Sequence, residues 1–383
     1  MHFHVETGGE SIEAEMHRRT WWEITTLDGR SQEIAGLDPV LLARNVQRRV
    51  PNALSDDVLA EGAHPREPYS QPQASASLDA LFPYMRALFA DFAQRCRAEQ
   101  ARQGGLTAMG MFELSTPIWT LTEKLHRIDV LEARLEAQVF RHCGPDSLSR
   151  LIVGFGSSLL AKARMLAILG EESLQARRTA RRETHKLEDL RQRMLELSVR
   201  CISYYSELLR DSAVRARFGW FIVRHVPAIP MIHLFRLLQT HTTGPSVDAA
   251  WALLHRTEGM GRTRKQFDAH YKGQGFHWLP TPEEPVLGDS TFLKAWEARK
   301  AAVGWGREDV EPEYIVEVKR RSEHAQRERE RTLLTAAMPW GAEAGVGVSM
   351  GTNLGGGFDP TPPSAELDED WEAWLRQLLG TSA

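Results

Sequence analysis

The 383-residue chain has few cysteines, and this scarcity excludes whole classes of protein. Cys96, Cys143 and Cys201 lie far apart in the sequence. Their spacing matches neither a zinc site nor a disulfide framework, and so few cysteines favour a reducing compartment inside the cell. The sequence therefore predicts no bound metal and no other cofactor.

Strand patterns and targeting segments are also scarce. No stretch alternates apolar and polar residues over a strand length between hairpin turns. Residues 1–15 lack the charged-then-apolar pattern of a signal peptide. The most apolar long stretch, from Phe218 to Leu238, is interrupted by charged residues and prolines, which argues against a membrane span. We expect an all-α protein without membrane association.

A basic excess is absent as well. The formal net charge is −4 and the isoelectric point is near 6.4. Proteins that grip DNA unaided usually carry a net basic face, because they must displace the counterions of the phosphates. The composition therefore argues against strong DNA binding by this chain alone.

Helical periodicity, in contrast, is abundant. Residues 148–169 are apolar nearly all round, as in a buried helix, and Gly170 is predicted to end it. Ser246 is predicted to cap a short helix from Val247 to His255. Two further segments have apolar residues at alternating steps of three and four, which is typical of one helix face. The first face comprises Leu187, Leu190, Met194, Leu197, Cys201, Tyr204 and Leu208, and the second comprises Leu121, Leu125, Ile128, Leu131, Leu135 and Val139.

Composition divides the chain into a body and a tail. Residues 341–364 contain seven glycines and almost no bulky apolar residue. Such a composition is typical of a flexible linker. We expect a large, irregular helical domain over residues 1–335, a Gly/Pro-rich linker over 336–365, and an acidic, helix-forming tail over 366–383.

A local motif near the start of the chain suggests a family. Residues 13–36 read EAEMHRRTWWEITTLDGRSQEIAG. An acidic residue, a paired Arg-Arg, a paired Trp-Trp and a Leu-Asp-x-Arg run follow one another there. This order resembles the middle homology region of the fungal-specific transcription factor domain. The residues that carry it are Arg18, Arg19, Trp21, Trp22, Asp28 and Arg30.

The resemblance extends loosely to Trp251. The Pro51-Asn52 pair and the acidic residues after Ser55 look like a short loop of that family, and residues 128–169 look like its next helical pair. Family members usually begin with six cysteines that hold two zinc ions, for which these residues offer no counterpart. The resemblance therefore implies the helical regulatory half of a zinc-cluster transcription factor, without the zinc-cluster DNA-binding module.

The Arg-Arg-x-Trp-Trp segment has two interpretations. Helical spacing brings Glu15 within pairing distance of Arg18 or Arg19. Trp21 and Trp22 point to different sides of a helix, so at least one of them should be deeply buried. We favour a structural role for this helix over the alternative, a ligand pocket lined by tryptophan.

No motif for catalysis is convincing. Asp56, Asp57 and Glu61 could suggest a magnesium site, as in a class I terpene cyclase, but their spacing differs from that family's. An N-cap at Ser55 followed by first-turn acidic residues explains them better. His225 and His233 lie in an apolar stretch and are expected to be core histidines with satisfied hydrogen bonds.

A basic cluster near the end of the body has two readings. Lys319, Arg320 and Arg321 could be recognised by a nuclear import receptor. The favoured alternative for such a cluster is a solvated helix whose charges form ion pairs.

The tail combines acidic and aromatic residues. Five acidic residues between Glu366 and Glu372 lie among large apolar side chains. This mixture on a flexible tether is typical of a transcriptional activation segment, although a helix docked on the body remains an equal alternative. The residues expected to contact a partner are Asp370, Trp371, Trp374, Leu375 and Leu378.

The sequence thus predicts a nuclear transcription regulator that acts through protein–protein contacts. Its expected partners are a transcriptional coactivator or a partner regulator, and homodimerisation is left open. The alternative is an enzyme on a repurposed helical body, such as a noncanonical terpene cyclase of secondary metabolism. Two or three carboxylates and a basic residue converging on an apolar cavity would favour that alternative.

Overall fold

The computed structural model describes residues 12–35, 49–53, 55–57, 77–102, 119–178, 184–256, 289–306 and 310–336. Within these ranges the chain is almost entirely helical and has no strand, which confirms the all-α prediction. The helices are α1 (Ile12–Ala35), α3 (Leu78–Arg102), α4 (Leu121–Gln138), α5 (Ser147–Arg178), α6 (Thr184–Arg210), α7 (Ser212–Arg224), α8 (Ala228–Thr240), α9 (Pro245–Arg256), α11 (Asp289–Val303) and α12 (Glu313–Ala336), with a 3-10 turn at Phe140–His142.

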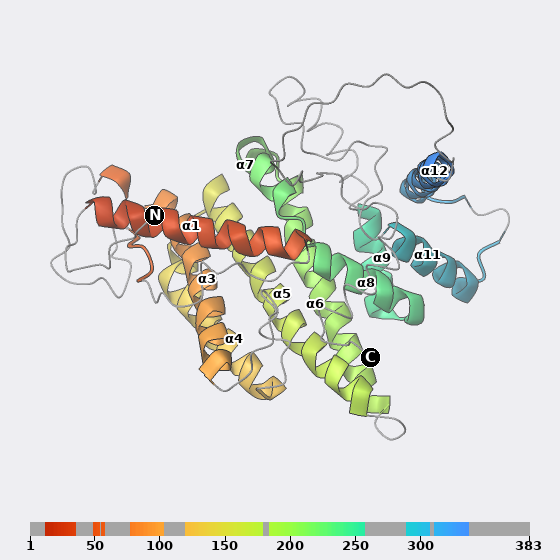
Figure 1. Cartoon of the computed structure of the whole chain (residues 1–383), viewed down its shortest axis with the longest axis horizontal. Coiled ribbons are helices and arrows are strands. Elements are labelled where there is room, and N and C mark those ends of the chain that lie inside the picture. The colour runs from red at the N-terminus through yellow and green to blue at the C-terminus, as the bar shows by residue number, and fades with distance from the viewer. Residues whose placement is uncertain are drawn as a thin grey trace, which may run out of the picture.

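The antiparallel pair α5 and α6 forms the centre of the body (Figure 1). Helix α5 continues to Arg178, so the predicted stop at Gly170 is wrong. A glycine inside a helix costs only about 1 kcal/mol relative to alanine, and the burial of the flanking apolar residues outweighs that cost. Leu166, Ile168 and Leu169 are all buried beside this glycine.

The apolar face predicted for α6 is confirmed, and the buried surface of the helix is wider than predicted. Leu190, Met194 and Cys201 from the predicted face are buried. Leu195 and Ile202, outside that face, are also buried, because α6 packs against α5 on one side and against α7, α8 and α9 on others. A helix with neighbours all around it buries more than one stripe.

Helix α4 has the predicted face and a defined start. The Thr120 hydroxyl accepts a hydrogen bond from the Glu123 backbone N–H, and the Glu123 carboxylate accepts one from the Thr120 N–H. This reciprocal capping box satisfies donors that the first turn would otherwise leave unpaired. Ile128, Leu131 and Leu135 then pack into the core.

A glycine sets the contact between α5 and the helices beside it. A Cβ atom on Gly156 would lie 2.7 Å from Cζ of Phe140 and 2.9 Å from Sδ of Met85. No ordinary Cβ contact is that short, so only glycine lets both side chains approach α5 so closely.

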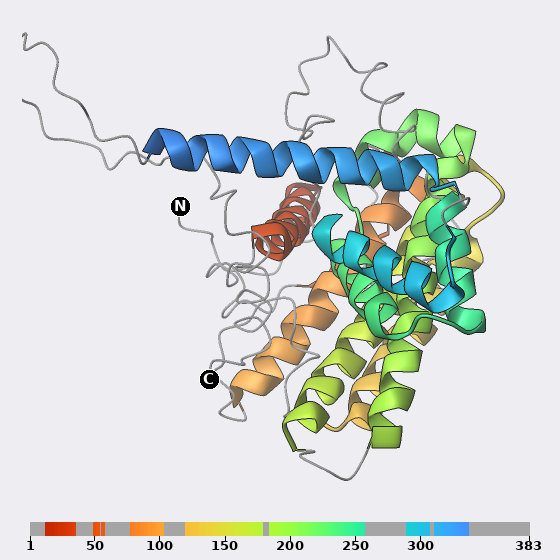
Figure 2. The same cartoon turned by 90° about the vertical axis from the view of Figure 1, so that its right-hand side faces the viewer.

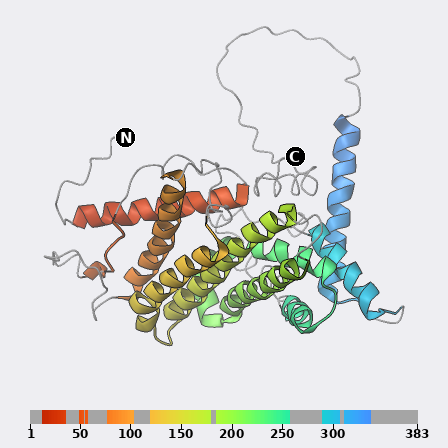
Figure 3. The same cartoon turned by 90° about the horizontal axis from the view of Figure 1, so that it is seen from below.

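Helix α1 lies across the other helices of the body. Figures 1 and 3 both show it crossing α3 at a steep angle, and Figure 1 shows it passing over the α5–α6 pair as well. Trp21 and Trp22 pack on Ala87 of α3 and form a small core of their own beside the main one.

The far end of the body contains an aromatic cluster. Trp251 of α9 contacts Phe292 and Trp296 of α11, with ring centroids 5.9 and 5.4 Å apart, and Trp296 contacts Trp305 at 5.1 Å. Helix α12 begins here with Ile315 and Val318 buried. Its remaining turns project away from the body (Figure 2).

Two parts of the described chain pass a simple length and hydropathy test for membrane spans. They are the first 26 residues of α5, Ser147–Glu172, and the α7–α8 pair, which is bent by 74°. Most of the apolar window in α5 is buried inside the protein, as expected for the central helix of a helical core.

Lys124 places a charged group inside this core. Its side chain is fully buried, and its Nζ has no hydrogen-bond partner within the described residues. Burial lowers the pKa of Lys124 from 10.5 to about 8, and the negative charge of Glu171 offsets only part of this effect. A buried ammonium without a partner destabilises the folded state.

We predict that Lys124→Met raises the free energy of unfolding at pH 7 by roughly 3 kcal/mol, because each unit of pKa difference corresponds to about 1.4 kcal/mol. Between pH 8 and 10.5 the unfolded lysine binds more protons than the folded one. Stability of the unsubstituted protein should therefore rise through that window and then level off, whereas the variant should show no such rise. Denaturant unfolding across pH measures both effects.

The control is Lys294→Met, which removes an exposed lysine of α11 and should leave the pH profile unchanged. If Lys124→Met lowers the stability at pH 7, the buried amine has a compensating interaction and this interpretation is wrong.

Candidate functional site

The charged residues at the start of α1 form a buried cluster around Glu15. The Glu15 carboxylate accepts hydrogen bonds from Arg18 Nε at 3.0 Å and Arg19 Nε at 3.2 Å, as the helical spacing predicted. It also accepts one from the backbone N–H of Asn52 at 2.9 Å. Because this carboxylate is almost fully buried, each of these donors compensates for the loss of water.

One of the acidic residues after Ser55, Asp56, contacts this cluster, and Glu61 lies outside the described ranges. Asp56 lies 2.8 Å from the Arg19 guanidinium, across 37 residues of sequence. Within the described ranges no three His, Cys, Asp or Glu side chains come close enough to hold a metal ion. Asp56 therefore acts as the partner of an arginine, a role that neither the magnesium nor the helix-capping interpretation predicted.

Both tryptophans of the motif are buried, one more than the minimum expected. Trp21 is 6% exposed and Trp22 is 2% exposed. The Trp22 indole Nε1 donates to the backbone carbonyl of Arg49 at 2.9 Å, which ties residues 49–53 to α1. Neither tryptophan lines the cavity described below, so this cavity gives no support to the alternative of a tryptophan-lined ligand pocket.

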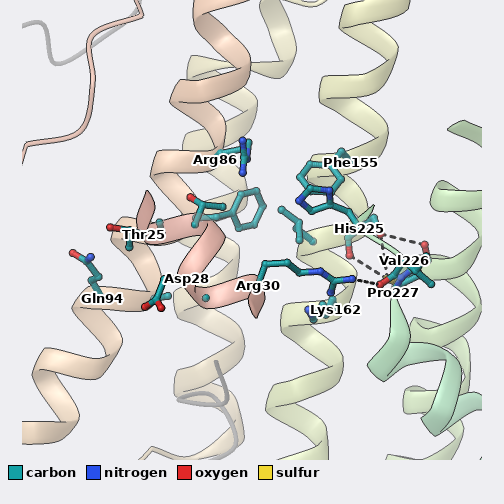
Figure 4. Close-up of a pocket in the computed structure, with 18 of the residues that line it drawn as sticks. Thr25, Asp28, Arg30, Arg86, Gln94, Phe155, Lys162, His225, Val226 and Pro227 are labelled. Atoms are coloured by element: carbon teal, nitrogen blue, oxygen red, sulfur yellow. Dashed lines mark hydrogen bonds between the residues drawn. The ribbon is translucent and has the colours of Figure 1, made fainter. Parts of the chain in front are cut away.

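Arg30, near the other end of the motif, binds a distant bend. Its guanidinium donates to the carbonyls of Arg224, at 3.1 Å, and Val226, at 2.9 Å, where α7 ends (Figure 4). The last carbonyls of a helix lack partners within the helix and carry partial negative charge, so a cation stabilises them. Arg30 thereby holds α1 against the α7–α8 connection.

A partly open cavity of about 190 Å³ lies beside α1, between the buried tryptophans and the contact of Arg30 with the α7–α8 connection. Its walls come from α1, α3, α5, one residue of α6 and the α7–α8 connection (Figure 4). Asp28 and Arg30 of the motif both contribute to the walls. The lining comprises Thr25, Thr26, Asp28, Gly29, Arg30, Arg86, Phe89, Ala90, Ala93, Gln94, Arg97, Phe155, Ser158, Leu159, Lys162, Cys201, His225, Val226 and Pro227.

An aromatic stack supports one wall of the cavity. The His225 ring stacks on Phe221 with centroids 4.0 Å apart and meets Phe155 edge-on at 5.3 Å. His225 Nδ1 lies 2.8 Å from the Phe221 carbonyl, so this histidine has the expected hydrogen bond. His233 is a core histidine as predicted, but its Nε2 has no partner among the described residues, and burial lowers its pKa to about 3.

Arg86 brings a buried cation to the cavity. Its guanidinium pairs with Glu23 of α1 at 2.5 Å and lies over the ring of Phe221, 5.5 Å from the centroid. Burial lowers the pKa of Arg86, and the Glu23 carboxylate acts in the opposite direction. An arginine still keeps its charge under these conditions. The sequence analysis overlooked this residue, although a single arginine among the apolar residues of segment 80–90 was a usable signal.

The predicted import cluster lies far from the cavity, on α12. Lys319 is held by Glu311 at 2.7 Å and lies 3.5 Å from Glu297, whereas Arg320 is exposed. Because Lys319, Lys300 and the Trp296 indole all donate to Glu311, the pKa of that carboxyl falls to about 2. The ion-paired interpretation therefore holds for Lys319. The tail residues from Asp370 to Leu378 lie outside the described ranges.

We predict that Trp22→Ala lowers the free energy of unfolding by roughly 3 to 5 kcal/mol, because it leaves a void and removes the bond to Arg49. Trp220→Ala, at an exposed tryptophan of α7, is the matched control and should change stability far less. Thermal or denaturant unfolding measures the difference. Trp21→Ala and Trp22→Ala variants that both keep the normal melting temperature would contradict the structural role.

Comparisons with known proteins place these features in context. No family model and no solved structure matches the chain. It is 23% identical over 238 residues to the C6 finger domain transcription factor hasF of Aspergillus fumigatus. The match covers 60% of this chain and only 30% of that protein. The chain is therefore distantly and partially similar to a fungal zinc-cluster transcription factor, which supports a transcription regulator.

Proposed function

We propose that this chain is the helical regulatory part of a fungal zinc-cluster-type transcription regulator, acting in the nucleus through protein–protein contacts. The observation that carries the proposal is the similarity to the C6 finger domain transcription factor of Aspergillus fumigatus. The Arg-Arg-x-Trp-Trp segment adds support, because its residues form the buried scaffold expected of a domain-organising helix.

The body offers α12 as a contact surface for a partner regulator or a second copy of the chain. Only the first turns of α12 are held by the body, through Ile315 and Val318. Beyond them, exposed arginines and glutamates alternate, as in the Arg327–Glu323 pair at 3.2 Å. Mixed charges on a projecting helix select partners by complementarity and contribute little to the stability of the body itself.

Nuclear import would use the basic residues of the same helix. Arg320 is exposed and available to a receptor, whereas Lys319 would first have to leave Glu311. Import through Arg320 and Arg321 therefore depends less on Lys319 than the sequence pattern implied. DNA contact would come from a partner, because the net charge and the cysteine content give this chain no evident DNA-binding surface.

The enzyme alternative gains no support from the cavity. Its discriminating feature was a group of two or three carboxylates around an apolar space. Among the described residues, Asp28 is the one carboxylate in the lining, and four cationic side chains accompany it. Magnesium-assisted release of a diphosphate needs several carboxylates to gather the metal, and this lining does not provide them.

The tail completes the proposal as a recruiting segment. Trp371, Trp374, Leu375 and Leu378 are separated by steps of three, one and three residues, so a bound helix would present them on one face. The acidic neighbours keep the free segment from collapsing and steer it toward a basic rim of a coactivator groove.

We predict that the chain, fused to an unrelated DNA-binding module, activates a reporter gene in fungal cells. The double change Trp371→Ala and Trp374→Ala should remove most of the signal, because it deletes the two largest anchors. Single acidic changes such as Asp370→Asn should only weaken it. Residues 361–383 alone, fused to the same module, should retain activity.

The control is the Trp220→Ala variant of the same fusion, which removes an exposed tryptophan of the body and should leave the signal unchanged. If the fusion gives no signal, and deletion of residues 361–383 lowers the melting temperature of the body, the tail is a docked structural helix and the recruiting role is wrong.

A further inference from the structure

Two buried nitrogens on the wall of the cavity have no partner within the described residues. They are Nε of Arg86 and Nε2 of Gln94, both on α3. An unsatisfied buried donor costs about 1 to 3 kcal/mol, and more when it belongs to a charged group. Such groups are rare in native proteins, and two of the six found among the described residues lie on the wall of this cavity, where a small molecule would bring polar atoms close to them.

The spacing of these donors sets the shape of that molecule. Arg86 and Gln94 are eight residues apart, which corresponds to roughly 12 Å along a helix. One acceptor group would therefore bind at the Arg86 end of the cavity and a second polar group at the Gln94 end. Phe89 of α3, between the two, and Phe155 and Leu159 of α5 provide apolar walls.

The charges of the lining residues indicate which charge the bound molecule should carry. Arg30, Arg86, Arg97 and Lys162 contribute four cations, against the carboxylate of Asp28. Glu23 pairs with Arg86 from outside the lining and is partly exposed to solvent. Cations outnumber carboxylates even when Glu23 is counted, so the cavity favours an anion.

The volume limits the size of the molecule. An apolar cavity of about 150 Å³ accepts a benzene ring in a well-studied case. The 190 Å³ here, with one side partly open, suits a body of one or two rings or an equivalent aliphatic chain. Arginine also binds carboxylates better than lysine does, because its planar fork offers several donors in a fixed geometry.

We propose that this cavity binds a small organic anion, whose carboxylate lies at the Arg86 guanidinium and whose apolar body lies against Phe89, Phe155 and Leu159. The positive charge of Arg86 attracts the carboxylate and orients the anion in the cavity. Gln94 selects for a polar group at the opposite end of the anion. The inference goes beyond the proposed function, since binding in solution needs neither DNA nor a partner.

Binding of such an anion would bridge α1, α3 and α5, because each contributes residues to the cavity wall. A ligand that binds only the folded state raises its stability with ligand concentration. The apolar contacts and the hydrogen bonds would together hold α1 more firmly on the body.

The test compares two probes that have the same rings and a hydroxyl at the far end but differ in charge, 6-hydroxy-2-naphthoate and 6-hydroxy-2-naphthamide. Calorimetric titration of the full chain should show at least fivefold tighter binding of the naphthoate, and only the naphthoate should lose affinity as salt is added. The naphthoate should also raise the melting temperature. Equal binding of the two probes, or no binding up to their solubility limits, would overturn the proposal.

Variants assign the preference to specific residues. The double change Arg86→Met and Glu23→Gln removes both charges of the pair and retains similar volume, and it should abolish the preference for naphthoate. Gln94→Leu keeps the charges and should weaken binding. Arg95→Met is the control on the same helix, since Arg95 is 72% exposed and pairs with Asp91. If Arg86→Met with Glu23→Gln does not fold, Gln94→Leu and the salt dependence decide. The assignment is wrong if Gln94→Leu leaves binding unchanged. It is also wrong if Arg95→Met reduces the preference for naphthoate as much as the double change of Arg86 and Glu23 does.

Discussion

The buried carboxylate of Glu15 is the interaction on which the N-terminal part of the structure depends. Arg18, Arg19 and the backbone of Asn52 all donate to it, and Arg19 extends the network to Asp56. A buried carboxylate is tolerated only when its lone pairs are satisfied, and removal of one partner from such a network is strongly destabilising. The carboxylate thus fixes residues 49–53 and 55–57 and the first turns of α1 relative to each other.

Three sets of contacts hold α1 across the body. Its start is held by Glu15, its middle by Trp21 and Trp22 on α3, and its end by Arg30 on the carbonyls of the α7–α8 bend. The cavity lies beside residues 25–30 of α1, which follow the two tryptophans and include Arg30. A change in the seating of α1 therefore changes the cavity and the bend at once, because Arg30 belongs to both.

Local patterns predicted much of this, because they depend on helical geometry alone. The apolar faces of α4 and α6 and the pairing of Glu15 with its neighbours follow from steps of three and four residues. The bond from Arg30 to Arg224 spans 194 residues, and no spacing rule connects such positions. The cavity was beyond prediction for the same reason, since its walls come from five parts of the chain.

Local signals also failed where tertiary packing outweighed them. Gly170 looks like a helix end, but burial of its neighbours carries α5 onward to Arg178. Lys319 belongs to a basic cluster that allowed two interpretations, and Glu311, which lies outside the helix, decides in favour of the ion-paired one. In both cases the sequence contains the residues that decide the outcome, and only the fold brings them together.

The arginines of the body have different roles, which depend on what surrounds each guanidinium. Arg18 and Arg19 neutralise a buried carboxylate, and Arg30 compensates helix-end carbonyls, so their donors serve the fold. Arg86 is as buried as Arg18, but its Nε has no acceptor among the described residues, as is also true of Nζ of Lys124 in the core. Arg86 differs from Lys124 because it lies on the wall of the cavity, together with Arg30. The cavity is therefore the place where the position of α1 and a small molecule would act on each other.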